Sequence, residues 1–153
     1  MRLFIATSFP EAVTKDLNRR IAGLKPKLPP ASWVRPETQH LTLAFLGERD
    51  ERLIDEIAPD LTTRLQDIER FRATIRGAGL FPNARRPRVG WAGLDPEGPF
   101  IDLAARVRDV LTKHRVELDR ADFKAHLTLM RLRESWPPAS VLMFEKALRD
   151  YRS

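Results

Sequence analysis

The tetrapeptide His40-Leu41-Thr42-Leu43 occurs twice in this sequence, because residues 126–129 repeat it letter for letter 86 positions later. Each copy lies in an apolar, alternating run that predicts a β-strand. Side chains alternate between the two faces of a strand, so each copy should present its histidine and threonine on one face and its two leucines to a core. We therefore take these two strands as the framework of the fold and of any active site.

One copy alone would be interpreted as an exposed histidine on a strand, because short motifs often match by chance. Two identical copies in a chain with only three histidines favour a functional pair instead. Histidine titrates near neutral pH, so a neutral imidazole can act as general base while a protonated one acts as general acid. We predict that His40 and His126 form such a catalytic pair.

Such a pair suits a reaction in which water loses a proton and a leaving oxygen gains one, as in the opening of a cyclic phosphodiester. That reaction also requires donors for the charge that grows on the phosphate oxygens. Thr42 and Thr128 are predicted to be those donors, and the guanidinium of Arg131 would add a further contact to the phosphate. Strict alternation turns Arg131 away from His126 and Thr128. Its assignment therefore requires a bulge or the end of the strand after residue 129.

A metal site is the alternative use of two histidines, since imidazole is also a common metal ligand. The chain has no cysteine, the two histidines lack the His-x-x-x-His spacing, and neither strand carries an acidic cluster. We therefore expect no metal and no cofactor. His114 is expected in the last turn of a helix, where the helix dipole favours a cation, and it receives no catalytic role.

The length of 153 residues fits one compact domain or two small lobes that share a core. The opening apolar run is too short for a signal peptide or a membrane span, so we expect a cytoplasmic protein without a membrane partner. The net charge of +6 favours a polyanionic partner such as nucleic acid, although a basic surface without a partner explains it equally well. The same two interpretations apply to the arginine-rich run at 85–88.

Hydrophobic periodicity and turn residues divide the chain into strands and helices. Strands are expected at 3–9, 39–46, 71–76, 88–94 and 123–132, helices at 11–24, 53–68, 101–111 and 141–151, and loops at 25–36 and 77–87. This order predicts an α+β fold with helices on one side of mostly antiparallel sheets.

The similarity to a known family extends well beyond the tetrapeptides. The segments 2–10, 33–47, 77–83, 87–91 and 123–131 resemble blocks of the RNA 2′,3′-cyclic phosphodiesterases, also called 2′-5′ RNA ligases, within the 2H phosphoesterase superfamily. The resemblance implies a single bilobal domain over 1–153, with two pseudo-symmetric lobes of antiparallel sheet, helices on the outside and a catalytic cleft between the lobes. Two departures are Ala125, where the family usually has proline, and an end at residue 153, before the further C-terminal strand that the family usually has.

The resemblance also implies an activity, namely hydrolysis of RNA 2′,3′-cyclic phosphate ends to 2′-phosphates without a metal, with 2′-5′ ligation of tRNA halves in some members. His40 would be the acid that protonates the leaving 3′-oxygen and His126 the base that activates water, although the symmetry lets these roles exchange. Thr42, Thr128 and Arg131 would hold the phosphate. Phe9 is a candidate for stacking on the nucleoside, with core packing as its favoured alternative.

Two alternatives stay open from the sequence, and we expect a monomer in each case. The chain would be either a non-catalytic module that binds RNA ends, or a 2H phosphodiesterase for small cyclic nucleotides or 2′-5′ oligoadenylates. Binding tolerates the loss of one histidine, whereas acid–base catalysis needs both.

Overall fold

The structure is a computed structural model that describes residues 1–118 and 122–152. Its elements are β1 (Arg2–Ser8), α1 (Glu11–Leu24), the 3₁₀ turn η1 (Lys25–Lys27), β2 (Ser32–Trp33), the 3₁₀ turn η2 (Pro36–Thr38), β3 (His40–Glu48), α2 (Arg52–Leu65), β4 (Thr74–Phe81), β5 (Val89–Asp95), α3 (Gly98–Lys113), β6 (His126–Arg131) and α4 (Pro138–Arg149). The predicted mixture of strands and helices in an α+β order is confirmed. Within the described residues, no helix combines the length and the apolar character needed to cross a membrane.

The chain forms two compact units, each assembled from three separate segments. Unit 1 contains Met1–Thr7, Thr42–Arg72 and Pro96–Ala125, and unit 2 contains Ser8–Leu41, Ala73–Asp95 and His126–Ser153. Both catalytic candidates, His40 and His126, belong to unit 2.

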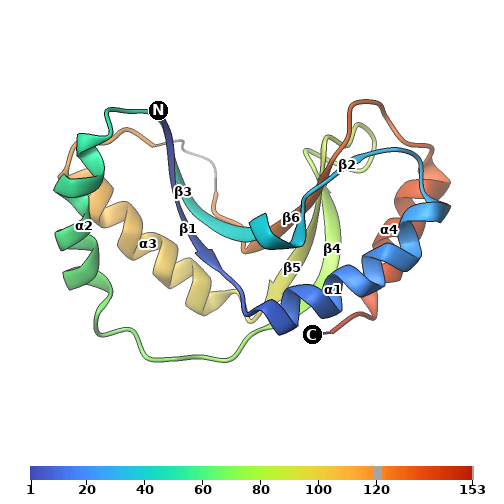
Figure 1. Ribbon diagram of the computed structural model, residues 1–153, viewed down its shortest axis with the longest axis horizontal. Helices are drawn as coiled ribbons and strands as arrows, with labels where there is room; N and C mark the ends of the chain where they lie inside the picture. The colour runs from blue at the N-terminus through green and yellow to red at the C-terminus, as the bar shows by residue number, and fades with distance from the viewer. Residues whose placement is uncertain (119–121, 153) are drawn as a thin grey trace. The chain divides into compact units, whose positions relative to one another are not determined.

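Unit 1 combines the β1–β3 sheet with helices α2 and α3, which lie side by side (Figure 1). The backbone N–H of Arg49 donates to the Met1 carbonyl at 2.9 Å, and the N-terminal ammonium lies 2.9 Å from the Glu48 carboxylate. The start of β1 therefore lies beside the end of β3, as in an antiparallel pair.

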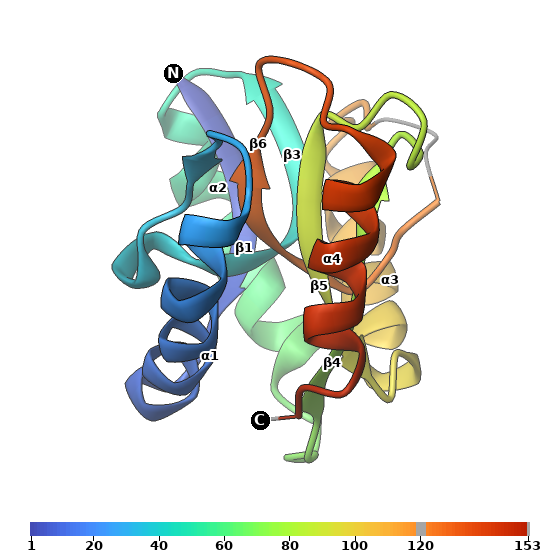
Figure 2. The same cartoon turned by 90° about the vertical axis from the view of Figure 1, so that its right-hand side faces the viewer.

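Unit 2 is built on a four-stranded antiparallel sheet with the strand order β2-β6-β5-β4. A Cβ added at Gly90 would meet the side chains of Met130 and Phe144, so α4 packs against this face of the sheet. The Arg20 guanidinium donates to the Ala147 carbonyl, which places α1 beside α4. Figure 2 shows the two helices in front of this sheet, and the opposite face carries the residues considered below.

The structure differs from the sequence-based prediction at both edge strands of this sheet, β4 and β2. Strand β4 was predicted to end at residue 76, but it continues to Phe81 through a register shift between Ile75 and Ala78. Gly77 has φ +76°, a conformation that glycine adopts without strain, so a residue that signals a turn serves here as a bulge inside the strand. The loop predicted at 25–36 contains the short strand β2, which pairs with β6.

The C-terminal segment meets the outer edge of β4. Helix α4 ends at Arg149, two residues before the predicted end, and Arg152 then forms a single antiparallel bridge with Arg76. Among the described residues, this bridge is the pairing found at the outer edge of β4.

Candidate active site

Both copies of the tetrapeptide have the burial pattern that the alternation predicted. Their leucines are buried, with exposed fractions of 0% at Leu41 and 9% at Leu43 and 0% at the two leucines of β6. The histidine and threonine of each copy are only partly buried. The predicted alternation, with the histidine and threonine on one face and the leucines in the core, is therefore confirmed for both strands.

A β-bulge in β6 brings Arg131 to the same face as His126 and Thr128. The pairing with β5 shifts between Gly90 and Trp91, and Leu129 and Met130 are consequently two successive buried residues. The extra residue moves every later side chain to the opposite face, because the alternation is displaced by one position. Arg131 is exposed and lies on the functional face, as its assignment required.

The register of β5 and β6 orders the functional groups along this face. His126 pairs with Gly93, Thr128 with Trp91, and Arg131 with Val89. The imidazole, the hydroxyl and the guanidinium therefore form one row along β6, on a strand that has neighbours on both sides.

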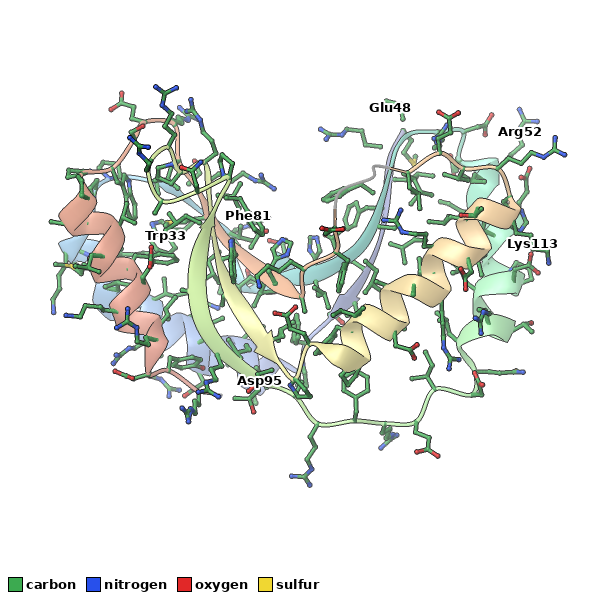
Figure 3. All side chains as sticks on the ribbon, turned by 180° about the vertical axis from the view of Figure 1, so that it is seen from behind. Trp33, Glu48, Arg52, Phe81, Asp95 and Lys113 are labelled. Carbon is green, nitrogen blue, oxygen red and sulfur yellow. The ribbon has the colours of Figure 1, made fainter. Side chains whose placement is uncertain are left out.

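The His126 imidazole packs against two aromatic rings of neighbouring strands. The Phe81 ring meets it edge-on, with centroids 5.0 Å apart and planes at 89°, and the Trp91 ring lies 6.1 Å away. Phe81 and Trp91 also contact each other at 5.1 Å. A Cβ at Gly79, which pairs with Trp91, would overlap the indole, so this glycine provides the space that the indole occupies. Figure 3 labels Phe81 at the end of β4, from where its ring reaches the imidazole.

The His40 imidazole is oriented by a backbone hydrogen bond. Its Nδ1 lies 2.7 Å from the carbonyl oxygen of Thr38. A carbonyl can only accept a hydrogen bond, so Nδ1 carries the hydrogen. In this way the turn η2, directly before β3, selects the tautomer of His40.

Gln39 fixes the backbone next to His40. Its side chain is 4% exposed and exchanges two hydrogen bonds with Asn18 of α1, at 2.9 and 3.0 Å. It also donates to the carbonyl of Val34, whose own N–H donates to the Leu129 carbonyl of β6 at 2.8 Å. The segment before β3 is thereby tied to the strand that carries His126.

The remaining candidates are placed as follows. Thr42 follows His40 on the same face of β3, although it is assigned to unit 1. Phe9 is partly buried in the short link between β1 and α1. His114 caps the C-terminus of α3, where its Nε2 lies 2.6 Å from Asp60, and that hydrogen bond lowers the pKa of the Asp60 carboxyl. Among the residues with described positions, no three His, Asp or Glu side chains gather as metal ligands would.

The sequence-based prediction missed Phe81, Trp91 and Gln39 as neighbours of the histidines. A signal for Trp91 was present, because aromatic residues often cover a glycine on the adjacent strand. Gln39 carried no signal, since its partner Asn18 is distant in the sequence and the pairing depends on how α1 packs.

Comparison with known proteins places this arrangement in a family. The model of the LigT-like phosphoesterases matches residues 8–91. The RNA 2′,3′-cyclic phosphodiesterase of Thermotoga maritima is 36% identical over 87% of this chain and 71% of its own length. The enzyme of the same name from Thermus thermophilus is 40% identical over 94% of this chain and 75% of its own length.

Solved structures agree with these relatives. The structure of the protein TT0787 from Thermus thermophilus matches with a TM-score of 0.75 and 37% identity, over 90% of this chain and 77% of that one. The structure of E. coli LigT complexed with 3′-AMP matches with a TM-score of 0.64 and 28% identity, over 88% and 74% of the two chains. With the repeated His-x-Thr strand and a family match over more than half of its length, this chain belongs to the LigT-like phosphoesterases of the 2H superfamily.

Proposed function

We propose that this chain hydrolyses the 2′,3′-cyclic phosphate at the end of an RNA strand to a 2′-phosphate, with His40 and His126 as general acid and general base and without a metal ion. The observation that carries the proposal is the pair of identical strands, which present a histidine and a threonine in the same way. The names of the relatives support the reaction, because cyclic RNA ends are what those enzymes are named for.

The proposed reaction balances with two proton transfers. His126 takes a proton from water, the resulting hydroxide attacks phosphorus, and the bond from phosphorus to the 3′-oxygen breaks. The leaving 3′-oxygen takes a proton from Nε2 of His40, and a 2′-phosphate remains. The hydrogen bond from Nδ1 to the Thr38 carbonyl supports Nε2 as the reacting nitrogen of His40, because it orients the ring and occupies Nδ1.

The charge on the phosphate oxygens would be stabilised by Thr42, Thr128 and Arg131. A guanidinium can bind a phosphate through two parallel hydrogen bonds, which makes Arg131 the strongest of the three contacts. The bulge in β6 supports this role, since without it the guanidinium would lie on the opposite face. Phe9 stays a candidate for the nucleoside contact. In 2′-5′ ligation a ribose 5′-hydroxyl would replace water as the attacking group at the same site, and the bond from phosphorus to the 3′-oxygen would break in the same way.

The test is hydrolysis of a short RNA that ends in a 2′,3′-cyclic phosphate, measured in EDTA for the wild type, His40→Ala and His126→Ala. General acid–base catalysis contributes roughly 10²–10⁴-fold to a rate, so we expect each variant to lose that factor in kcat. The double variant should lose little more than either single variant, because the two groups act as a unit.

His114→Ala is the matched control, because it removes the third imidazole and should leave kcat unchanged. Activity that disappears in EDTA and returns with a divalent ion would overturn the metal-free mechanism. RNA-end binding without turnover in the wild type would instead identify a binding module.

A further inference from the structure

Five arginines gather at the end of the unit 2 sheet where β6 ends. Three of them, Arg85, Arg86 and Arg88, lie in the β4–β5 connection, and Arg131 and Arg133 lie at and just after the end of β6. We call this group the basic end. All five side chains are exposed. Within the described ranges 1–118 and 122–152, none of them forms an ion pair.

Hydrogen bonds hold the basic end together as part of the sheet. The N–H of Leu132 donates to the Arg88 carbonyl at 2.9 Å, and the Arg88 guanidinium donates to the Arg133 carbonyl. In the loop itself, the Asn83 side chain accepts the backbone N–H groups of Arg85 and Arg86, each at 3.0 Å. An asparagine that caps a turn in this way fixes the backbone, so the two arginines extend from an ordered loop.

The basic end continues the row of functional groups along β6. His126, Thr128 and Arg131 follow one another on one face, and the loop 82–88 begins where that row ends, because Phe81 and Arg131 both pair with Val89. Five residues of strand span about 17 Å, so the loop lies within a few nucleotides of the imidazole. A substrate phosphate held by Arg131 would therefore have the further positive charge of the basic end beside it, beyond the end of β6.

A hollow of about 400 Å³ adjoins the same end of the sheet, lined by residues 29–32 and 133–136. Its volume lies in the range of small-ligand pockets, roughly 300–1,000 Å³. Ser32 of this hollow pairs with Arg131 in the sheet register. The basic end thus combines exposed charge with a concave surface beside the proposed phosphate contact.

We propose that the basic end binds the RNA strand on the 5′ side of the cyclic phosphate, so that the chain acts on RNA ends in preference to mononucleoside cyclic phosphates. This inference rests on the proposed function. The two segments that form the basic end, residues 82–88 and 131–136, contain five arginines and one acidic residue, Glu134. This excess of positive charge suits a phosphodiester backbone. Exposed arginines bind phosphates by charge and bidentate hydrogen bonds, so the contact would not depend on the base sequence.

The experiment compares two substrates in EDTA, an RNA octamer that ends in a 2′,3′-cyclic phosphate and the mononucleotide adenosine 2′,3′-cyclic phosphate. The variant is Arg85→Gln with Arg86→Gln, which keeps the backbone hydrogen bonds to Asn83. The matched control is Lys146→Gln with Arg149→Gln, which removes the same charge from exposed positions of α4, on the other face of the sheet.

We expect the Arg85/Arg86 variant to raise KM for the octamer by about tenfold at moderate salt and to leave mononucleotide hydrolysis within about twofold. The slope of log(kcat/KM) against log[salt] for the octamer should become less steep by about 1.4, since single strands contribute roughly −0.7 per phosphate contact. The α4 control should change neither quantity.

An equal effect on both substrates, an unchanged salt slope, or the same change in the α4 control would overturn the role of the basic end. Absence of hydrolysis of either substrate by the wild type would overturn the proposed function itself, and the two failures are thereby distinguished.

Discussion

The two copies of the tetrapeptide have the same sequence and the same burial, yet different surroundings hold their histidines. His40 starts β3, and its Nδ1 is bound to the Thr38 carbonyl at 2.7 Å. His126 starts β6, an interior strand, and its ring packs edge-on against Phe81 and beside Trp91. A carbonyl partner selects a tautomer, and ring packing restrains the plane of the imidazole.

The copies also differ five residues after the histidine. In β3 this position is Phe45, which is 67% exposed, and in β6 it is Arg131. The charge available to a phosphate is therefore carried by one copy. We infer that the duplicated tetrapeptide supplies the acid–base pair, while the residues around each copy differ in what they contribute to the site.

The largest effect among variants outside the histidine pair is expected at Arg131. Arg131→Gln should lower kcat/KM for adenosine 2′,3′-cyclic phosphate by about 10–100-fold, because a hydrogen bond to a charged group contributes roughly 1.5–3 kcal/mol. Arg131→Lys should recover part of the loss, since it restores the charge but not the two-pronged geometry. Steady-state kinetics of both variants, with Arg149→Gln as the control, would measure the difference. Equal activity of Arg131→Gln and the wild type would mean that Arg131 does not contribute to phosphate binding, and the two copies would then not differ in this respect.

A smaller effect is expected from loss of the aromatic contact to His126. Phe81→Leu should lower kcat several-fold, because an edge-on ring pair contributes about 0.5–1.5 kcal/mol to holding the imidazole. Phe71→Leu is the matched control, since Phe71 makes the same type of edge contact with Phe100 in unit 1. Measurement of kcat and Tm for both variants separates the two changes, because only the contact at Phe81 involves His126. If both variants lose stability and keep kcat, the ring packing has no role in positioning.

Several features of the two strands and of helix α1 could be predicted from the sequence. The alternation within each tetrapeptide predicted which side chains face the core. The assignment of Arg131 required either a bulge or the end of the strand, and the structure contains a bulge. Helix α1 also begins and ends where its periodicity and Pro26 indicated. These features depend on local patterns, which a single sequence carries.

The contacts that distinguish the two histidines were not accessible in the same way. Strand β2 is two residues long in a proline-rich segment, so it shows no alternation from which to predict it. Gly77 and Gly79 resemble turn residues, yet one forms a bulge and the other makes room for Trp91. Both roles depend on the neighbouring strand, and pairing between distant segments is what sequence periodicity does not encode.

The smallest effect on activity is expected at His114, the histidine without a threonine partner. Its Nε2 is bound to Asp60 at 2.6 Å, and this hydrogen bond, together with the nearby Lys113 ammonium, lowers the pKa of the Asp60 carboxyl from its usual value. A carboxyl whose pKa is lowered in the folded state stabilises the fold above its unfolded pKa, and that stabilisation is lost as the pH falls through the folded value. His114→Gln should therefore keep kcat but lower Tm slightly at neutral pH.

The difference in Tm between the wild type and His114→Gln should shrink only where the pH falls below the usual pKa of an aspartate carboxyl, because Asp60 then becomes protonated. Thermal unfolding from neutral to acidic pH would measure it, and Asp60→Asn should reproduce the loss at neutral pH, since it removes the charged acceptor of the same hydrogen bond. By contrast, His40→Ala and His126→Ala should leave the effect of Asp60 protonation on Tm unchanged, because neither residue takes part in the hydrogen bonds that lower the pKa of Asp60. A fall in kcat for His114→Gln as large as that for His40→Ala would show that the repeated threonine does not mark the catalytic histidines.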